Sequence, residues 1–335
     1  MKNRCIYIAF LISITTIAQV SDFKNIDFTI ANNTAKLQEG AGLENLPVLA
    51  YNLTHNLKTD VEKFRAIYTW VCTNIKGDAN QDNKVTKKRK KLKNDSLAYL
   101  KWNNSYKKIA FKKLLKKQKT MCTGYAYLIK ELCFIANIEC KIINGYGRST
   151  EANVLDLELI NHSWNAVKLN NKWYLCDATW SSGYMINYSR FVQDYNDGYF
   201  LTNPILFAKN HYPSQKKWLL DSTLIASKFK ASPLVYGDTF THKIIPLLPE
   251  EMKINSEVYQ EIEFRFKTLK KISTDKVKLI QYSGLLEKPF KIYALKNENG
   301  ILSFRYQFKQ KGNYDVHLKL EEDIVATYIF EITKN

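Results

Sequence analysis

The chain has 335 residues, of which 45% are hydrophobic and 13% aromatic. This composition excludes an intrinsically disordered protein, and the length suffices for two domains with cores of their own. The formal net charge of +18 at pH 7 brings anionic partners and surfaces into consideration.

Residues 1–18 have the pattern of a secretory signal peptide. Lys2 and Arg4 precede an apolar run over residues 5–17, and Ala18 is a small residue at the expected cleavage site. The run is shorter than the roughly 20 apolar residues that a membrane-spanning helix needs. We therefore expect an exported, soluble protein, secreted or periplasmic, without a transmembrane anchor.

Residues 19–59 show little hydrophobic periodicity, and we expect an N-terminal lead-in with one helix near 46–57. Asp60 is the expected N-cap of a helix over residues 61–75. The apolar residues of this helix fall on one face: Phe64, Ile67, Tyr68 and Val71.

Residues 84–119 form a strongly basic segment. They hold fifteen Lys or Arg against one acid, Asp95, and so supply most of the net charge. The second half predicts an amphipathic helix whose apolar residues lie opposite paired lysines; these residues are Ile109, Phe111, Leu114 and Leu115. Two interpretations stay open: a solvated face, or attraction to an anionic surface or acidic substrate. Specific nucleic-acid binding is not expected, because no recognition motif or aromatic platform accompanies the charge.

Cys122 lies at the start of a predicted helix. The apolar stripe of that helix has the spacing of one buried face, and comprises Tyr125, Leu128, Ile129, Leu132, Cys133 and Ala136. Asn137 is the expected left-handed stop, and a strand over residues 138–145 follows. A thiol on the first helical turn lies where the helix dipole favours the thiolate, the nucleophilic form of cysteine.

His162 and Asp177 lie on a predicted β-hairpin. Asn170-Asn171 separates two strand-like runs, and both residues tolerate positive φ, as a two-residue hairpin loop requires. Pairing residue 169 with 172 makes 164 face 177 and 162 face 179. His162 and Asp177 are then diagonal neighbours on one face, within side-chain reach. Such a pair is a base oriented by a carboxylate.

The other cysteines and the histidines do not indicate a metal or cofactor site. Five cysteines remain after the signal peptide, and an odd number suits one free reactive thiol. Cys133 and Cys176 are expected to be buried small side chains. No C-x-x-C pair occurs and the histidines are scattered, so no metal is expected. Gly145-Tyr-Gly147 lacks the third glycine of a dinucleotide-binding loop, so no cofactor is expected.

The hydrophobic pattern changes over residues 238–335. Short alternating runs are separated by turn residues, which predicts a β-sandwich of the immunoglobulin-like kind; the runs are 261–266, 276–282, 290–295, 301–308, 314–320 and 326–332. We expect this domain to be separable by a cut after about Gly237.

Two long strings resemble the transglutaminase-like superfamily: CTGYAYLIKELCFIANIECKIINGYGRS and NHSWNAVKLNNKWYLCDATWSSG. A third, GYFLTNPILFAKNHYPSQKKWLL, resembles the segment after the core in the kyphoscoliosis-peptidase branch. The resemblance implies an α+β fold over residues 60–237, a papain-like core in which the nucleophile helix packs on an antiparallel sheet. It also implies a catalytic triad with Cys122 as nucleophile, His162 as general base and acid, and Asp177 as orienting carboxylate.

The expected function is that of an exported cysteine hydrolase or acyltransferase acting on protein or peptide amide bonds through an acyl-enzyme. Water as acceptor gives proteolysis or deamidation, and an amine gives cross-linking. Candidate oxyanion donors are the backbone N–H of Cys122 and the side chain of Gln118. The alternative is a catalytically silent binding module of the cell envelope that keeps the fold.

Overall fold

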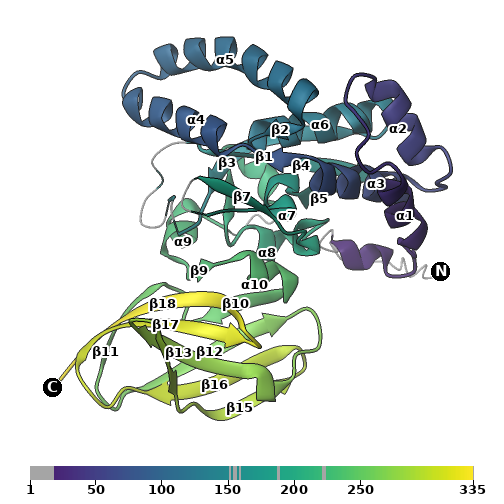
Figure 1. The fold of residues 1–335 in the computed structure, drawn as a ribbon. Helices are drawn as coiled ribbons and strands as arrows, with labels where there is room; N and C mark the ends of the chain where they lie inside the picture. Colours follow the sequence, from purple (N-terminus) through teal and green to yellow (C-terminus); the bar gives the residue numbers. More distant parts are fainter. Residues whose placement is uncertain are drawn as a thin grey trace, which may run out of the picture.

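The computed structural model describes residues 19–150, 152–153, 157, 160–186, 189–220 and 224–334, and Figure 1 shows their arrangement. The signal peptide predicted for residues 1–18 lies outside the described residues. Within the described ranges, no helix combines the length and apolar character needed to cross a membrane.

A group of helices forms one side of the first half of the chain. α3 (Asp60–Asn74) lies among α1 (Thr29–Leu37), α2 (Leu46–Thr54) and α6 (Cys122–Ile135) (Figure 1). The predicted face of α3 is buried throughout. Its N-cap is Thr59 and not Asp60, because Thr59 and Glu62 satisfy each other's backbone N–H groups in a capping box.

The lead-in belongs to the same hydrophobic core as α3. Ala35 of α1 and Leu49 and Leu53 of α2 are buried in one cluster with Phe64 and Ile67 of α3. The side-chain amide of Asn45 caps α2 by accepting from the N–H of Val48. Residues 19–59 therefore contribute packing to the domain, which their weak periodicity does not indicate.

An antiparallel sheet lies against α6. Its strands are β5 (Lys172–Cys176), β4 (His162–Leu169), β3 (Cys140–Gly147) and β8 (His211–Pro213), in that order across the sheet. The predicted hairpin is confirmed, because Asn170 and Asn171 have φ of 48° and 62° and Leu169 pairs with Lys172. The core is thus the expected helix packed on an antiparallel sheet.

The basic segment forms a helical hairpin, α4 (Ala79–Lys91) and α5 (Ser96–Lys117), that projects beside α6 (Figure 1). Its base is closed by parallel pairing of β1 (Lys76–Gly77) with β2 (Lys119–Thr120). We call it the basic hairpin.

The predicted apolar face of α5 is only half right. Leu114 is buried and Phe111 packs on Tyr127, but Ile109 is 62% exposed and Leu115 is 41% exposed. At about 100° per residue, Ile109 lies roughly 200° around the helix from Phe111, so one contact face cannot cover both.

Short elements connect these layers. They are α7 (Ala178–Ser182), β6 (Gly183–Ile186), β7 (Arg190–Gln193), α8 (Pro204–Phe207), α9 (Ala226–Ala231), β9 (Leu234–Val235) and α10 (Gly237–Thr241). Further 3-10 turns lie at Val20–Phe23, Asp197–Tyr199, Lys216–Leu219 and Thr274–Lys276.

The C-terminal region is a sandwich of two sheets around one core. One sheet has the order β10 (Ile244–Leu248), β12 (Glu261–Thr268), β16 (Ile301–Gln307) and β15 (Tyr293–Glu298). The other has the order β11 (Lys253–Glu257), β18 (Asp323–Thr333), β17 (Gly312–Leu320), β13 (Val277–Ser283) and β14 (Leu286–Phe290), with β9 also pairing β18. Phe264, Phe304 and Phe330 are buried together between the two sheets. The predicted sheet-rich C-terminal region is confirmed, although the predicted strand over 290–295 is divided between β14 and β15.

The expectation of a clean cut after Gly237 does not fit the packing at this point. Phe240 stacks on Tyr199 with ring centroids 4.1 Å apart, and Phe240 and Ile245 share a buried cluster with Trp164 of β4. The Arg148 guanidinium also contacts the sulfur of Met252, beyond the cut, at 3.6 Å. Residues beyond 237 therefore complete the core beneath the sheet, which the alternating pattern of the later strands does not reveal.

We expect a fragment that ends at Gly237 to lose cooperative thermal unfolding, because it exposes the apolar partners of Phe240 and Ile245. In the full chain, Phe240→Ala alone should lower the free energy of unfolding by about 3–5 kcal/mol, as for other buried aromatic truncations. Thermal and urea unfolding followed by near-ultraviolet circular dichroism measure both effects. A fragment that unfolds cooperatively near the full-length midpoint would contradict the shared core.

Candidate active site

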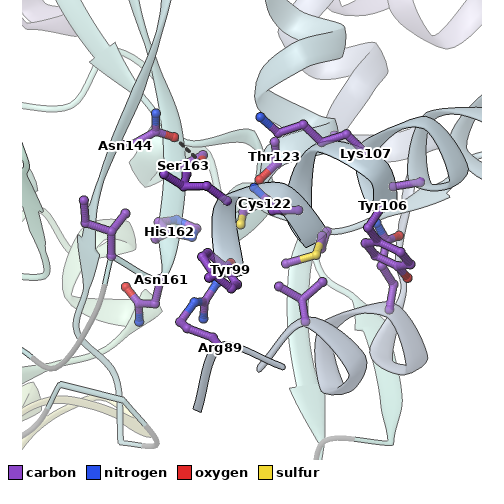
Figure 2. Close-up of a pocket in the computed structure, with 18 of the residues that line it drawn as sticks. Arg89, Tyr99, Tyr106, Lys107, Cys122, Thr123, Asn144, Asn161, His162 and Ser163 are labelled. Atoms are coloured by element: carbon purple, nitrogen blue, oxygen red, sulfur yellow. Dashed lines mark hydrogen bonds between the residues drawn. The ribbon is translucent and has the colours of Figure 1, made fainter. Parts of the chain in front are cut away.

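Cys122 is the first residue of α6 and lines a cavity of about 510 Å³ (Figure 2). The helix begins as predicted, and the core residues of its stripe, from Tyr125 to Cys133, are buried. Asn137 has φ of 59°, and the N–H of Ile138 returns to the carbonyl of Cys133, a left-handed helix stop. The packing of the stripe thus holds Cys122 at the edge of the core, where its side chain is 7% exposed.

His162 begins β4 and meets Asp177 as predicted. The imidazole Nε2 lies 2.7 Å from Oδ2 of Asp177, and both side chains are buried. His162 also lines the cavity that contains Cys122, and the thiol is close enough to raise the pKa of the imidazole. Because Asp177 occupies Nε2, the other ring nitrogen, Nδ1, is the one left for the thiol.

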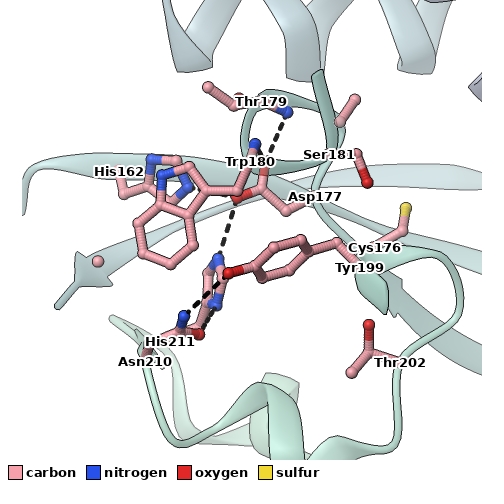
Figure 3. A network of polar contacts seen from close by, with 12 residues as sticks. His162, Cys176, Asp177, Thr179, Trp180, Ser181, Tyr199, Thr202, Asn210 and His211 are labelled. Atoms are coloured by element: carbon pink, nitrogen blue, oxygen red, sulfur yellow. Dashed lines mark hydrogen bonds and ion pairs between the residues drawn. The ribbon is translucent and has the colours of Figure 1, made fainter. Parts of the chain in front are cut away.

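The chain departs from the predicted register directly after β5. The strand ends at Cys176, and Asp177 is the N-cap of α7, so residue 179 is helical and does not face 162. Oδ1 of Asp177 accepts the N–H of Thr179 at 2.8 Å and, more weakly, that of Trp180 at 3.4 Å (Figure 3). Asp177 therefore starts a helix with one oxygen and holds His162 with the other.

His211, on β8, is a second histidine bound to Asp177, and sequence reasoning missed it. Its Nε2 lies 3.1 Å from Oδ2 of Asp177 (Figure 3). Its ring stacks on Phe207 with centroids 3.9 Å apart. Its Nδ1 contacts Oδ1 of Asn210 at 2.6 Å. The available signal was its place in the third family-like string, because a lone histidine in a short strand has no periodicity of its own.

The three side chains of this network, His162, Asp177 and His211, differ in their pKa shifts. Burial alone would lower the pKa of His162, but the charge and hydrogen bond of Asp177 and the contact with Cys122 raise it to about 10. Burial alone would raise the pKa of Asp177, but His162 and His211 hold it well below its ordinary value. Burial lowers the pKa of His211 to about 4 against the influence of Asp177. At neutral pH the arrangement is an imidazolium–carboxylate pair supported by a neutral imidazole.

Trp180 and Gly147 restrict the orientation of His162. The indole of Trp180 stacks on the imidazole with centroids 4.7 Å apart. A Cβ at Gly147 would lie 3.1 Å from Cβ of His162 and 3.1 Å from Cζ2 of Trp180, so a side chain there would crowd both rings. The absence of a side chain at Gly147 thus makes room for the histidine.

A metal would have to displace the hydrogen bonds of this network. Ligand atoms of His162, Asp177 and His211 all lie within 4.8 Å of one another. Both histidines, however, direct Nε2 at the same oxygen of Asp177, at 2.7 and 3.1 Å. The distances fit a shared hydrogen-bond acceptor, so the residues present are better suited to orienting an imidazole than to holding a cation.

Gln118 is not placed to stabilise an oxyanion. Its side-chain amide donates to the carbonyl of Ala41 at 2.6 Å, and its backbone has φ of 48° where it caps α5. The left-handed turn directs the side chain toward the lead-in and away from the cavity, which corrects the prediction. The first N–H groups of a helix have no intrahelical partner. Cys122 and Thr123 are the first residues of α6 and both line the cavity, so their N–H groups are available donors.

The raised pKa of His162 predicts a pH-dependent contribution to stability. A group whose pKa rises on folding stabilises the fold fully below its unfolded value, about 6.5, and loses this contribution as pH approaches the folded value. The destabilisation caused by His162→Ala should therefore be largest near pH 6 and shrink toward pH 10, leaving a constant cost of lost packing. Urea unfolding of both proteins across this range measures it, and a pH-independent difference would contradict the ion pair.

Residues 47–178, which include the Cys122, His162 and Asp177 constellation, match the transglutaminase-like superfamily. These residues form a transglutaminase-like domain.

The chain is similar to kyphoscoliosis peptidase of Homo sapiens, at 32% identity over 204 residues, covering 60% of this chain and 27% of the relative. It is similar to the Mus musculus protein of that name at 30% identity over 256 residues, covering 74% and 34%. Hillarin of Drosophila melanogaster is 26% identical over 203 residues, covering 56% and 22%. The chain spans only about a third or less of these relatives' length.

Among solved structures, the Lin-41 filamin domain aligns with 24% of this chain and 82% of its own. The identity is 14% and the TM-score 0.20.

Proposed function

We propose that this chain is a cysteine hydrolase or acyltransferase that cleaves protein or peptide amide bonds through an acyl-enzyme. The observation that carries the proposal is the placing of Cys122 on the first turn of α6, in one cavity with an imidazole that Asp177 holds at 2.7 Å. The membership of the transglutaminase-like superfamily, whose members include cysteine peptidases and transglutaminases, supports it.

The proposed reaction begins with the thiolate of Cys122 and the imidazolium of His162. The sulfur attacks the amide carbonyl carbon, and the oxygen of the tetrahedral intermediate takes the negative charge. As the C–N bond breaks, His162 gives its proton to the leaving amine, and a thioester remains on Cys122. Water or an amine then attacks the thioester and returns a proton to His162, which restores the enzyme.

Each neighbour of His162 has a part in this sequence. Asp177 stabilises the imidazolium and directs Nδ1 at the thiol, and His211 and the α7 backbone hold Asp177 in place. Trp180 covers one face of the ring. The N–H groups of Cys122 and Thr123 are the proposed oxyanion donors, because helix N-termini stabilise negative charge.

We further propose that the protein is exported, because residues 1–18 have the pattern of a signal peptide. We also propose that its substrate is a protein or peptide. An anionic surface or acidic substrate is the proposed partner of the basic hairpin. Residues 84–93 of this hairpin contain seven Lys or Arg and no Asp or Glu.

Alkylation with iodoacetamide tests whether Cys122 is an activated nucleophile. At pH 7 we expect Cys122 to react many times faster than glutathione, because a cationic His162 favours the thiolate. Cys72, Cys133, Cys140 and Cys176 are buried away from the cavity and serve as internal references. Peptide mass spectrometry after timed quenching gives each rate.

The matched control is His162→Ala, which leaves the cysteine in place and removes the base. Its Cys122 should react no faster than glutathione at pH 7. Equal rates in wild type and His162→Ala would support the silent binding module instead, since accessibility alone would then explain the labelling. Incubation with peptide pools, with and without a fluorescent primary amine, separates hydrolysis from amine transfer.

A further inference from the structure

The cavity at Cys122 has an unusual balance of charge. One wall is the nucleophile end of α6 with His162 and Asn161, and the other is the basic hairpin (Figure 2). Among the described residues that line it, the charged side chains other than His162 are Arg89, Lys93 and Lys107, and no Asp or Glu is present. Much of the remaining lining is apolar or aromatic, so the fixed charges that a negative group entering here would meet are cations.

Arg89 is the best placed of these cations. It lies near the end of α4, in the wall that the basic hairpin forms, and lines the cavity together with Tyr99 (Figure 2). Its Nε is buried and has no hydrogen-bond partner among the described residues. An arginine donor buried without an acceptor costs free energy, which a planar carboxylate would recover by bidentate hydrogen bonding.

Asp82, two turns earlier on α4, interacts electrostatically with Arg89. Burial raises the pKa of Asp82, while the charges of Arg89 and His162 oppose that rise. Asp82 does not line the cavity. Its charge therefore weakens the positive potential of Arg89, but it does not accept a hydrogen bond from Nε of Arg89.

We infer that Arg89 is a carboxylate receptor in the substrate cavity, so that the enzyme takes peptides with a carboxylate close to the amide that Cys122 attacks. This inference rests on the proposed function. Lys93 and Lys107 add positive charge at the rim of the same cavity. The carboxylate belongs either to the C-terminus of the substrate or to an acidic side chain, and both present the same two oxygens to a guanidinium.

The decisive test compares two alkylating probes that differ only in charge. Iodoacetate carries a carboxylate next to the reactive carbon, and iodoacetamide carries a neutral amide. In each case the Cys122 thiolate forms an S–C bond as iodide leaves. We expect the ratio of the iodoacetate rate to the iodoacetamide rate to be higher at Cys122 than for glutathione.

Arg89→Gln should lower this ratio about tenfold, the size expected for losing a hydrogen bond to a charged group. Lys90→Gln is the matched control, because it removes the same charge from an exposed position of α4 that does not line the cavity. Arg89→Lys keeps the charge and loses the planar fork, and should restore part of the ratio. Circular dichroism confirms that each variant is folded.

An unchanged ratio in Arg89→Gln, or an equal fall in Lys90→Gln, would overturn the inference. These outcomes are independent of the proposed function, which fails instead if the iodoacetamide rate at Cys122 is no greater in wild type than in His162→Ala. The ratio of the iodoacetate rate to the iodoacetamide rate can thus fall while Cys122 stays an activated nucleophile.

Peptide binding to the inert Cys122→Ala protein then identifies the source of the carboxylate. Two fluorescein-labelled tetra-alanine probes differ in a free or amidated C-terminus, and two end-capped pentapeptides differ in a central Glu or Gln. Tighter binding of the free terminus assigns a C-terminal carboxylate, and tighter binding of the Glu peptide assigns a side chain. Equal binding within each pair would contradict the receptor.

Discussion

We expect Cys122→Ala to abolish amide-bond turnover while leaving the fold intact. The thiolate is the only group in the proposed reaction that bonds to the substrate carbonyl, and removal of a triad nucleophile lowers turnover on the order of 10⁶-fold in subtilisin. Cys122 packs in a small cluster with Val85 and Met121, outside the main core, so the melting temperature should change little. Product formation by mass spectrometry and the mass of a trapped acyl-enzyme measure the loss.

Cys133→Ala is the matched control on the same helix. Its thiol is fully buried in the main core, so its removal leaves a cavity and should lower stability while turnover persists. The two cysteines of α6 should therefore show opposite effects on activity and stability. If Cys122→Ala retains wild-type turnover, the covalent mechanism is wrong.

We expect Asp177→Asn to fold and to lose activity on the order of 10⁴-fold, the loss seen when an amide replaces the carboxylate of a Ser-His-Asp triad. An amide oxygen can still cap α7 at Thr179, but the amide nitrogen then faces Nε2 of His162 and of His211. His162 must turn its proton to Nδ1, toward Cys122, where it cannot accept the proton of the thiol. The pH dependence of turnover and of Cys122 alkylation measures this effect.

The matched control is Asp323→Asn. Asp323 pairs with Nε2 of His242 at 2.8 Å and lies outside the cavity, so its variant should keep wild-type turnover. Asp177→Asn should also lower the free energy of unfolding by about 1–3 kcal/mol, because a buried donor loses its acceptor. Wild-type turnover in Asp177→Asn would show that Asp177 only caps α7 and does not take part in catalysis.

The meeting of His162 with Asp177 could be predicted because it depends on local structure. Only 15 residues separate them, and two asparagines with positive φ set the register of the intervening hairpin. The position of Cys122 at a helix start was similarly readable, because the apolar stripe from Tyr125 has one period throughout. In both cases neighbours in sequence determine the outcome, since turn chemistry and helix periodicity act over a few residues.

The end of β5 shows where local pattern stops being sufficient. Alternation extends the strand to residue 179, but Asp177 caps α7 and the chain turns. An aspartate that caps a helix and one within a strand look alike in sequence. The choice depends on Tyr199, whose carbonyl accepts the N–H of Asp177 at 3.2 Å from a separate segment.

Three features follow only from the tertiary structure: the second histidine that holds Asp177, the arginine that lines the cavity, and the residues beyond 237 that belong to the core. His211 reaches Asp177 across 34 residues because β8 pairs with β3, and Arg89 reaches the cavity because parallel pairing of β1 with β2 closes the basic hairpin. Phe240 completes the core from beyond the expected boundary. Such contacts depend on which surfaces pack together, and a lone histidine, an arginine among lysines or a phenylalanine in a five-residue helix has no periodicity that records its distant partner.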